Sequence, residues 1–262
     1  MTSVTRELLD EVVALTRAAG DLTLRWFRQE ELNIEHKGDG TPVTAADRAA
    51  ERYLREQLAS RFPDDAIIGE EEPDSKGSSG RTWIIDPIDG TKAFTHGVPL
   101  YSNLLALYDD LGAAIGVINL PALGETVYAA RGIGCFFDGR PARVSDRSAL
   151  DGGCVCTSGL GSWSSEQLAA VRSSGALLRT WGDGYGFALV ATGRAEAMVD
   201  PRVAIWDVAP MPVILSEAGG RFTTTGGDEH LPVDATGVLS GVATNGHVHD
   251  EVLTLLAAHL SE

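Results

Sequence analysis

Apolar residues recur every three or four positions near the N-terminus, which predicts an amphipathic helix. The residues that carry this spacing are Leu8, Val12, Leu15, Ala19, Leu22 and Trp26. A second helix is predicted from Thr44 to about Phe62, because Pro63 cannot continue it. Between the two, the polar, glycine-punctuated stretch from His36 to Pro42 predicts a mobile loop.

Short apolar runs bounded by acids, glycine or proline predict strands along the rest of the chain. In the first half these are residues 66–71, 83–85, 104–108, 114–118 and 126–129, with a tight turn at Asp138-Gly139. After residue 150, predicted strands at 155–158, 177–181, 195–199 and 241–244 alternate with predicted helices near 165–174, 184–192, 208–218 and 247–260. No repeat or long linker interrupts the pattern. We expect one mixed α/β unit over residues 1–262, with halves of about 1–145 and 146–262.

Composition narrows the class of protein. The chain has 262 residues and 44% hydrophobic content, which suffices for a sizeable core. No apolar run is long enough for a membrane span, and the first residues do not resemble a signal peptide. A net charge of −16 without any Lys/Arg cluster argues against binding to nucleic acid or to anionic membranes. We therefore expect a cytoplasmic protein.

The three cysteines, Cys135, Cys154 and Cys156, do not form a disulfide framework. Cys154-Val155-Cys156 has the spacing of half a metal site, but no Cys/His pair accompanies it at a distance typical of zinc sites. Buried strand positions are the preferred interpretation.

The candidate chemistry begins with Asp86 and Asp89, which follow the apolar run 83–85. Two carboxylates this close repel each other unless a cation lies between them. Gly90 and Thr91 come next and indicate the start of a helix, whose free N–H groups suit an anion. A cation site beside an anion site indicates metal-assisted phosphoryl chemistry. The alternative is that the two acids only cap the helix and shape a turn.

Other acids follow the same pattern. Glu70 and Glu71 end the preceding predicted strand, and acids at successive strand ends converge on one edge of a sheet. Carboxylate and carbonyl oxygens are the ligands that Mg²⁺ prefers. Asp47 and Asp207 are further candidates, each with a structural alternative. Thr44 to Asp47 fits a capping box, and Asp207 stands at a predicted helix start as a possible N-cap.

Taken together, these segments resemble the inositol monophosphatase family of Mg²⁺-dependent, lithium-sensitive phosphatases. The matching motifs occur in family order and span most of the chain. They are residues 42–47 (PVTAAD), 69–71 (GEE), 83–91 (WIIDPIDGT) and 206–209 (WDVA). The resemblance implies a layered αβαβα sandwich of the inositol monophosphatase and fructose-1,6-bisphosphatase type, usually a homodimer.

The resemblance also implies two to three Mg²⁺ ions in the active site. One would be held by Glu70, Asp86 and the carbonyl of Ile88. A second would be shared by Asp86, Asp89 and Asp207. A third, looser ion would lie near Glu70 beside the loop.

Roles for the reacting groups follow from the same likeness. Asp47, Glu70 and Thr91 are the implied catalytic residues, with Thr91 hydrogen-bonded to Asp47 and helping to deprotonate the attacking water. The N–H groups of Gly90 and Thr91 would hold phosphate oxygens as negative charge shifts between them. Asp89 would face the substrate as well as a metal, and so would Asp207.

Substrate choice is predicted to depend on another segment. Asp183 lies in Trp181-Gly182-Asp183-Gly184-Tyr185-Gly186, at a position where inositol monophosphatases usually have a small residue. Asp200 lies where those enzymes have a glutamate that contacts a ring hydroxyl. An added carboxylate suits a cationic ligand, and the segment 181–207 resembles histidinol-phosphate phosphatases of this family. We therefore expect Asp183 to contact the cationic end of histidinol phosphate; the alternative is a helix N-cap.

Other functions remain open at this stage. Inositol 1-phosphate is an alternative substrate. So is 3′-phosphoadenosine-5′-phosphate, because Lys92 follows Thr91 as in the phosphatases of that nucleotide. Arg194 and Arg202 are the other basic candidates for a second phosphate, although exposed positions explain both. A non-catalytic partner of a transcription or RNA-processing complex is the alternative of another class. It gives no physical reason for so many mutually repelling acids.

Overall fold

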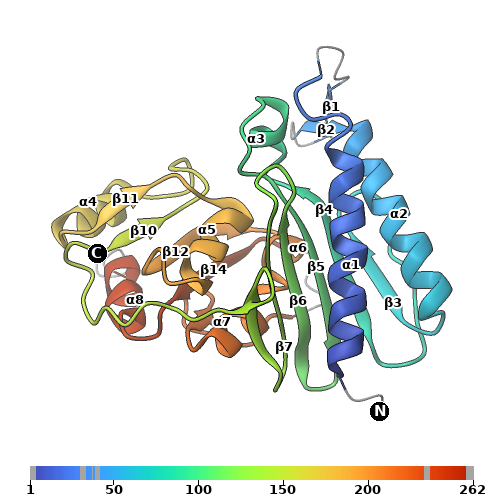
Figure 1. The fold of residues 1–262 in the computed structure, drawn as a ribbon. Coiled ribbons are helices and arrows are strands. Elements are labelled where there is room, and N and C mark those ends of the chain that lie inside the picture. Colours follow the sequence, from blue (N-terminus) through green and yellow to red (C-terminus); the bar gives the residue numbers. More distant parts are fainter. Residues whose placement is uncertain (1–3, 30–33, 37, 39–41, 233–236, 258–262) are drawn as a thin grey trace.

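The computed structural model describes residues 4–29, 34–36, 38, 42–232 and 237–257. Its helices and sheets form five layers (Figure 1). Helices α1 (Arg6–Thr23) and α2 (Ala45–Arg61) cover one face of a seven-stranded sheet. Helices α5 (Asp183–Ala191), α6 (Ile205–Val208) and α7 (Met211–Ala218) lie between this sheet and a five-stranded sheet. Helices α4 (Ser165–Ser173) and α8 (His249–Ala257) cover the outer face of the second sheet. The predicted αβαβα sandwich is confirmed.

The seven-stranded sheet has the order β3-β4-β5-β6-β7-β8-β9. Only β3 and β4 are parallel neighbours; the following pairs are antiparallel. The strands are β3 (Ala66–Gly69), β4 (Thr82–Asp89), β5 (Ser102–Asp109), β6 (Gly112–Leu120), β7 (Glu125–Ala130), β8 (Gly134–Phe137) and β9 (Arg140–Pro141). A five-residue helix, α3 (Thr91–Thr95), follows β4, and a small hairpin joins β1 (Ile34–His36) to β2 (Pro42–Thr44).

The five-stranded sheet has the order β11-β10-β12-β14-β13. Its central strand β12 runs parallel to β10 and antiparallel to β14. The strands are β10 (Cys154–Cys156), β11 (Leu177–Arg179), β12 (Ala197–Val203), β13 (Arg221–Thr223) and β14 (Leu239–Thr244). The parallel strands β10, β11 and β12 therefore end at one edge, where loops after strands converge.

Alternate side chains of β4 pack into two different hydrophobic cores, and the same alternation sets the direction of Asp86. Trp83 and Ile85 pack in the cluster beneath α1 and α2, whereas Ile84 packs in the cluster that α5 and α7 share with the first sheet. Because side chains alternate along a strand, Asp86 falls on the same side as Ile84, facing the interior between the sheets. The amphipathic pattern of α1 is confirmed, since Val12, Leu15 and Ala19 are buried against the same sheet.

The predicted strands and helices are largely found, with informative differences. β4 continues through Asp86 to Asp89 instead of ending before the acids, and its register shifts between them. Pro87 explains the shift, because it has no N–H for the ladder, and Asn103 Nδ2 donates to its carbonyl at 2.6 Å. The helix predicted over 208–218 is two helices, α6 and α7, separated at Ala209-Pro210. Strands β1, β2, β8, β9 and β13 were not predicted; each has only two to four residues, which is too short for a periodic pattern. Within the loop expected from His36 to Pro42, residues 37 and 39–41 lie outside the described residues.

Candidate active site

Three carboxylates meet where β4 faces α6. Asp86 and Asp89 come from the bulged end of β4, and Asp207 comes from the first turn of α6. One carboxylate oxygen of each lies within 4.8 Å of those of the other two. The alternative interpretation of Asp207 as the N-cap of α6 is wrong, because Ala204 is the N-cap. Asp207 is the third helical residue, and its Oδ2 accepts from the backbone N–H of Ala204 at 2.7 Å.

Burial and mutual repulsion raise the pKa of each of these acids. For Asp86 and Asp89 burial is the largest cause and lifts the pKa well above its ordinary value, with neighbouring carboxylates adding to it. The pKa of Asp207 is raised to about 7 by burial and by the charges of Glu70 and Asp183, among others. Glu70 also raises the pKa of Asp86, so its carboxylate belongs to the same electrostatic group. Four acids in such proximity need protons or cations to coexist.

Hydrogen bonds orient the acids of the cluster but leave one buried carboxylate oxygen without a donor among the described residues. Asp89 Oδ2 accepts from Ser102 Oγ at 2.5 Å and from the N–H of Gly184 at 2.6 Å, at the start of α5. A Cβ on Gly184 would lie 2.2 Å from Ser102 Oγ and 2.9 Å from Asp89 Oδ2, so only glycine permits this approach. Asp86 Oδ1 is buried and has no hydrogen-bond partner among the described residues.

Asp47 forms the predicted capping box and lies within electrostatic reach of Glu70. Its Oδ2 accepts from the N–H and the hydroxyl of Thr44, at 2.8 and 2.6 Å, so the capping box is present. Its Oδ1 is buried without a hydrogen-bond partner in the described part of the chain. Burial, with a contribution from Glu70, raises the pKa of Asp47 to about 6. The expected hydrogen bond between Thr91 and Asp47 is wrong for this structure. The Thr91 hydroxyl donates instead to the carbonyl of Ile88 at 3.0 Å, the acceptor one turn away.

This donor set fits a hard divalent cation. It consists of carboxylate oxygens with the Ile88 carbonyl next to Asp89 in the chain. Two buried oxygens, Asp47 Oδ1 and Asp86 Oδ1, have no hydrogen-bond partner among the described residues. A buried oxygen without a hydrogen bond costs stability unless an ion or water satisfies it. The arrangement is one that a metal would stabilise.

A buried ion pair that sequence reasoning missed holds the segment of Glu70. Glu51, fully buried in α2, accepts from the N–H groups of Glu71 and Glu72 at 2.8 and 3.0 Å. Arg55 Nε donates to Glu51 at 2.8 Å, and Arg55 also donates to the Glu72 carbonyl at 2.8 Å. A Cβ on Gly69 would lie 2.3 Å from Glu51 Oε1, which explains the glycine of the Gly-Glu-Glu motif. The i, i+4 spacing from Asp47 to Glu51 to Arg55 was the available signal.

Asp183 lies beside Gly90, at the start of α3. Gly90, the N-cap of α3, has φ 76°, and a Cβ there would come within 2.9 Å of Asp183 Oδ2. Asp183 is not the N-cap of α5; Gly182 holds that position, and Asp183 itself has φ 53°. A positive φ is uncommon for a residue other than glycine and is held here by the hydrogen bond from its N–H to Ser158 Oγ at 2.7 Å. The capping interpretation of Asp183 is therefore wrong.

Asp200 contributes to the same arrangement from β12. Its carboxylate accepts from Thr157 Oγ1 at 3.1 Å and from the N–H and Oγ of Ser158 at 2.8 and 2.5 Å. Burial raises the pKa of Asp200 to about 6, with a contribution from Asp183. Asp200 thus fixes Ser158, which in turn fixes the backbone of Asp183. Ser158 carries no motif of its own and was not predicted.

The basic candidates do not form a second phosphate site. Arg194 lies over the Phe137 ring and pairs with Glu125 at 3.5 Å, and Arg202 is exposed on β12. Lys92 is close enough to Asp183 for its charge to lower the pKa of that carboxyl, which opposes the larger effect of burial. One lysine beside an acid is weak support for a bisphosphorylated nucleotide.

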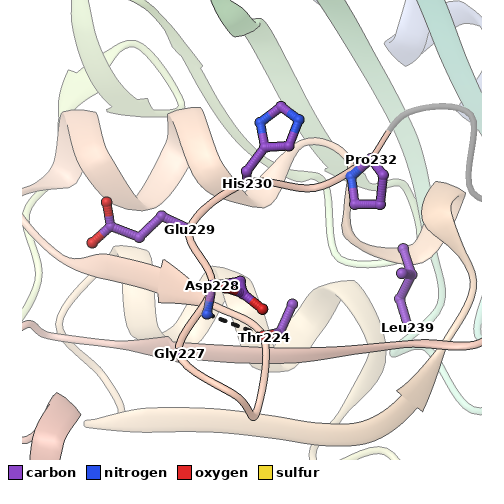
Figure 2. Close-up of a pocket in the computed structure, with 7 residues that line it drawn as sticks. All are labelled: Thr224, Gly227, Asp228, Glu229, His230, Pro232 and Leu239. Carbon is purple, nitrogen blue, oxygen red and sulfur yellow. Dashed lines mark hydrogen bonds between the residues drawn. The ribbon is translucent and has the colours of Figure 1, made fainter.

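A surface hollow elsewhere is unrelated to these acids. Figure 2 shows it, with a volume of about 730 Å³, lined by Thr224, Gly227, Asp228, Glu229, His230, Pro232 and Leu239. The N–H of Asp228 donates to Thr224 Oγ1 at 3.2 Å, and Glu229 pairs with Arg221. The hollow contains none of the clustered carboxylates and lies in the loop between β13 and β14, so it is not the candidate active site.

Comparison with known proteins decides the family. The model of the inositol monophosphatase family matches residues 5–261. The chain belongs to the inositol monophosphatase family. A histidinol-phosphatase of Chlorobaculum parvum is 42% identical, covering 88% of this chain and 91% of its own. A histidinol-phosphatase of Mycobacterium tuberculosis is 40% identical, covering 94% and 96%. The solved structure of an inositol monophosphatase (IMPase) of Thermotoga maritima is 34% identical, with a TM-score of 0.86 and coverage of 95% and 96%.

As a member of this family, the protein is a phosphatase, which confirms the broad function expected from its motifs. The acid cluster is where a phosphatase of this family would be expected to place its metals. Among the described residues, no helix is long and apolar enough to cross a membrane.

Proposed function

We propose that this inositol monophosphatase family member hydrolyses histidinol phosphate to histidinol and inorganic phosphate, with Mg²⁺ in its active site. The observation that supports the substrate most strongly is the identity of 42% and 40% to two proteins named histidinol-phosphatase, over nearly their whole lengths. The added carboxylate of Asp183, beside Gly90 at the start of α3, agrees with a substrate that carries an amine and an imidazole.

Two to three Mg²⁺ ions would be held by the carboxylates of Glu70, Asp86, Asp89 and Asp207 and by the carbonyl of Ile88. When bound, these ions neutralise charge on the phosphate and lower the pKa of the attacking water. The Ile88 carbonyl can serve a metal while it accepts from Thr91, because a carbonyl has two lone pairs.

The protein groups would position the phosphate and take the proton. The N–H groups of Gly90, the left-handed N-cap of α3, and of Thr91, its first residue, would face the phosphate oxygens. Thr91 Oγ1, which donates to Ile88, retains lone pairs that can accept a hydrogen from water. Asp47, whose pKa is about 6, and Glu70 are the remaining candidates for the proton.

The leaving group would face the negative charges of Asp183, Asp89 and Asp207. Asp200 would act indirectly, because it holds Ser158, which accepts from the N–H of Asp183. This differs from the direct substrate contact expected for Asp200, because the hydrogen bonds of its carboxylate go to Thr157 and Ser158. Its proposed contribution to substrate binding is the position of Asp183.

A phosphate-release panel with Mg²⁺ tests the proposal. It contains histidinol phosphate, inositol 1-phosphate, fructose 1,6-bisphosphate and 3′-phosphoadenosine-5′-phosphate. We expect the highest kcat/KM for histidinol phosphate and no activity in EDTA. A clear preference for another ester would overturn the substrate assignment, and EDTA-resistant turnover would overturn the metal assignment.

The Asp183→Asn variant tests the substrate contact directly. We expect kcat/KM for histidinol phosphate to fall about tenfold more than that for inositol 1-phosphate, which corresponds to about 1.4 kcal/mol of selective binding. Asp110→Asn, at an exposed turn, is the control with the same change of charge. Equal factors for the two substrates would refute the contact.

Inositol 1-phosphate is the second candidate, since the solved relative from Thermotoga maritima is an IMPase at 34% identity. The homodimer stays a prediction that sedimentation would test. We also propose that the enzyme works in the reducing cytoplasm, with Cys135, Cys154 and Cys156 as free thiols.

A further inference from the structure

Two cysteines outside the active site lie close enough to react with each other. Cys154 and Cys156 are two residues apart on β10, so their side chains leave the same face of the strand. Their Sγ atoms are 3.9 Å apart. Cys156 is fully buried, whereas Cys154 is partly exposed. The pair thus has one member that solvent can reach and one that it cannot.

The surroundings make the two thiols different. The contact with Cys156 lowers the pKa of Cys154, the charge of Arg179 also lowers it, and burial and Glu196 oppose these effects. Arg179 lies on β11 in direct register with Cys156. The pKa of Cys156 is raised by the contact with Cys154 and by burial. Cys154 is the member suited to attack an electrophile, because the thiolate is the reactive form.

The third cysteine provides an internal comparison. Cys135 lies on β8 in the first sheet and is 3% exposed. Burial raises its pKa to about 12. A buried thiol with a raised pKa is a poor nucleophile toward a dissolved peroxide. Any selective oxidation of this chain should therefore begin at Cys154.

β10 leads directly into the loop that holds Asp183, the residue whose carboxylate is proposed to contact the substrate. Cys156 is followed by Thr157 and Ser158, whose hydroxyls donate to Asp200 at 3.1 and 2.5 Å. Ser158 Oγ also accepts from the N–H of Asp183 at 2.7 Å. A displacement of Cys156 would therefore be transmitted over two residues to the position of Asp183.

We propose that Cys154 and Cys156 form an oxidation site, at which hydrogen peroxide creates an intramolecular disulfide that displaces Ser158 and lowers phosphatase activity. The Cys154 thiolate attacks the peroxide, whose O–O bond breaks. A sulfenic acid forms on Cys154, and hydroxide leaves and becomes water. The Cys156 sulfur then attacks the sulfur of Cys154, loses its proton and expels a second water. Two thiols are oxidised by two electrons in total, and one hydrogen peroxide is reduced to two waters.

The geometry predicts that this disulfide is easily reduced. Closing the pair requires the sulfurs to move from 3.9 Å to about 2.05 Å. Residues i and i+2 of a strand have Cα atoms about 6.6 Å apart, near the upper limit for a disulfide. The bond must therefore bend β10 at its end. A strained disulfide has a high reduction potential and is readily reversed by thiols.

Mass spectrometry of the peroxide-treated protein tests the site independently of the substrate. We expect the wild type to lose about 2 Da, with a single cross-link between residues 154 and 156 in peptide maps. Activity should fall at least about fivefold and recover with dithiothreitol. Cys135→Ser should behave as the wild type. Cys156→Ser should stop at a sulfenic acid that dimedone traps, and Cys154→Ser should stay unmodified.

Three results would overturn the proposal. They are the absence of the 154–156 cross-link at peroxide concentrations that oxidise free cysteine, oxidation of Cys154→Ser as fast as the wild type, and complete cross-linking without any change in activity. Activity is followed on whichever ester the untreated enzyme hydrolyses best, so a wrong substrate assignment would not be mistaken for a failed oxidation site. Circular dichroism of each serine variant checks that it is folded.

Discussion

The repulsion within the acid cluster predicts that one acid can be removed with a gain in stability of the metal-free protein. Asp207→Asn is the suitable change, because the amide oxygen of asparagine can still accept from the N–H of Ala204, now at 2.7 Å. The side chain keeps its size and loses its charge. The substitution removes the free-energy cost of ionising Asp207 beside Asp86, Asp89 and Glu70.

The magnitude follows from the raised pKa. Asp207 has a pKa of about 7 in the folded protein and an ordinary value of 3.8. The folded state therefore binds more protons than the unfolded state between these pH values, and stability falls as pH rises through this window. At about 1.36 kcal/mol per pH unit, the carboxyl destabilises the folded state by about 4 kcal/mol at pH 8, where it is ionised, and by about 2 kcal/mol at pH 5, where folding requires its protonation. Partial exposure of Asp207 reduces these figures, so we expect a gain of about 2–4 kcal/mol for the variant at pH 8.

Urea unfolding in EDTA at pH 5 and pH 8 measures this gain. Asp207→Asn should be more stable than the wild type at both pH values, and by about 2 kcal/mol more at pH 8. Adding Mg²⁺ at 100 times the dissociation constant should stabilise the wild type by about 2.7 kcal/mol and the variant much less. Asp110→Asn, which is exposed, should change neither curve. If Asp207→Asn is less stable than the wild type at pH 8 in EDTA, the cluster is not repulsive and the reasoning is refuted.

Three further predictions concern groups outside the cluster. Glu51→Gln removes the carboxylate that pairs with the Arg55 guanidinium, so we expect the free energy of unfolding in urea to fall by about 3 kcal/mol. We also expect the Mg²⁺ concentration needed for half-maximal activity to rise about tenfold. An unchanged Mg²⁺ requirement would exclude a role of Glu51 in positioning the segment of Glu70. Gly184→Ala should cost about 1–3 kcal/mol and at least about tenfold in kcat/KM, because its Cβ would lie 2.2 Å from Ser102 Oγ; full activity would contradict this. His249, buried with a pKa lowered to about 4, contributes stability that is complete above its ordinary value of 6.5 and is lost as pH falls toward 4. The wild type should therefore lose about 2 kcal/mol relative to His249→Gln between pH 8 and pH 5, and parallel pH profiles in urea unfolding would refute it.

Local sequence patterns determined the secondary structure wherever periodicity was strong. The spacing of Val12, Leu15 and Ala19 places one face of α1 on the sheet, and Thr44 caps the start of α2 with the expected capping box. Short strands such as β9 and β13 escaped prediction, because two or three residues carry no periodic signal and form only through their neighbours in the sheet.

The sequence by itself was sufficient for the family and for the identity of the clustered acids. Asp86 and Asp89 stand in one motif, and two acids three residues apart after an apolar run are visible without coordinates. Only the tertiary structure decided what the side chains contact. The Thr91 hydroxyl donates to Ile88 and not to Asp47, and Asp183 is held by Ser158 in place of capping α5. Such contacts join residues that are distant in sequence, and they depend on the bulge of β4, the layer order and the available partners, none of which a local pattern encodes.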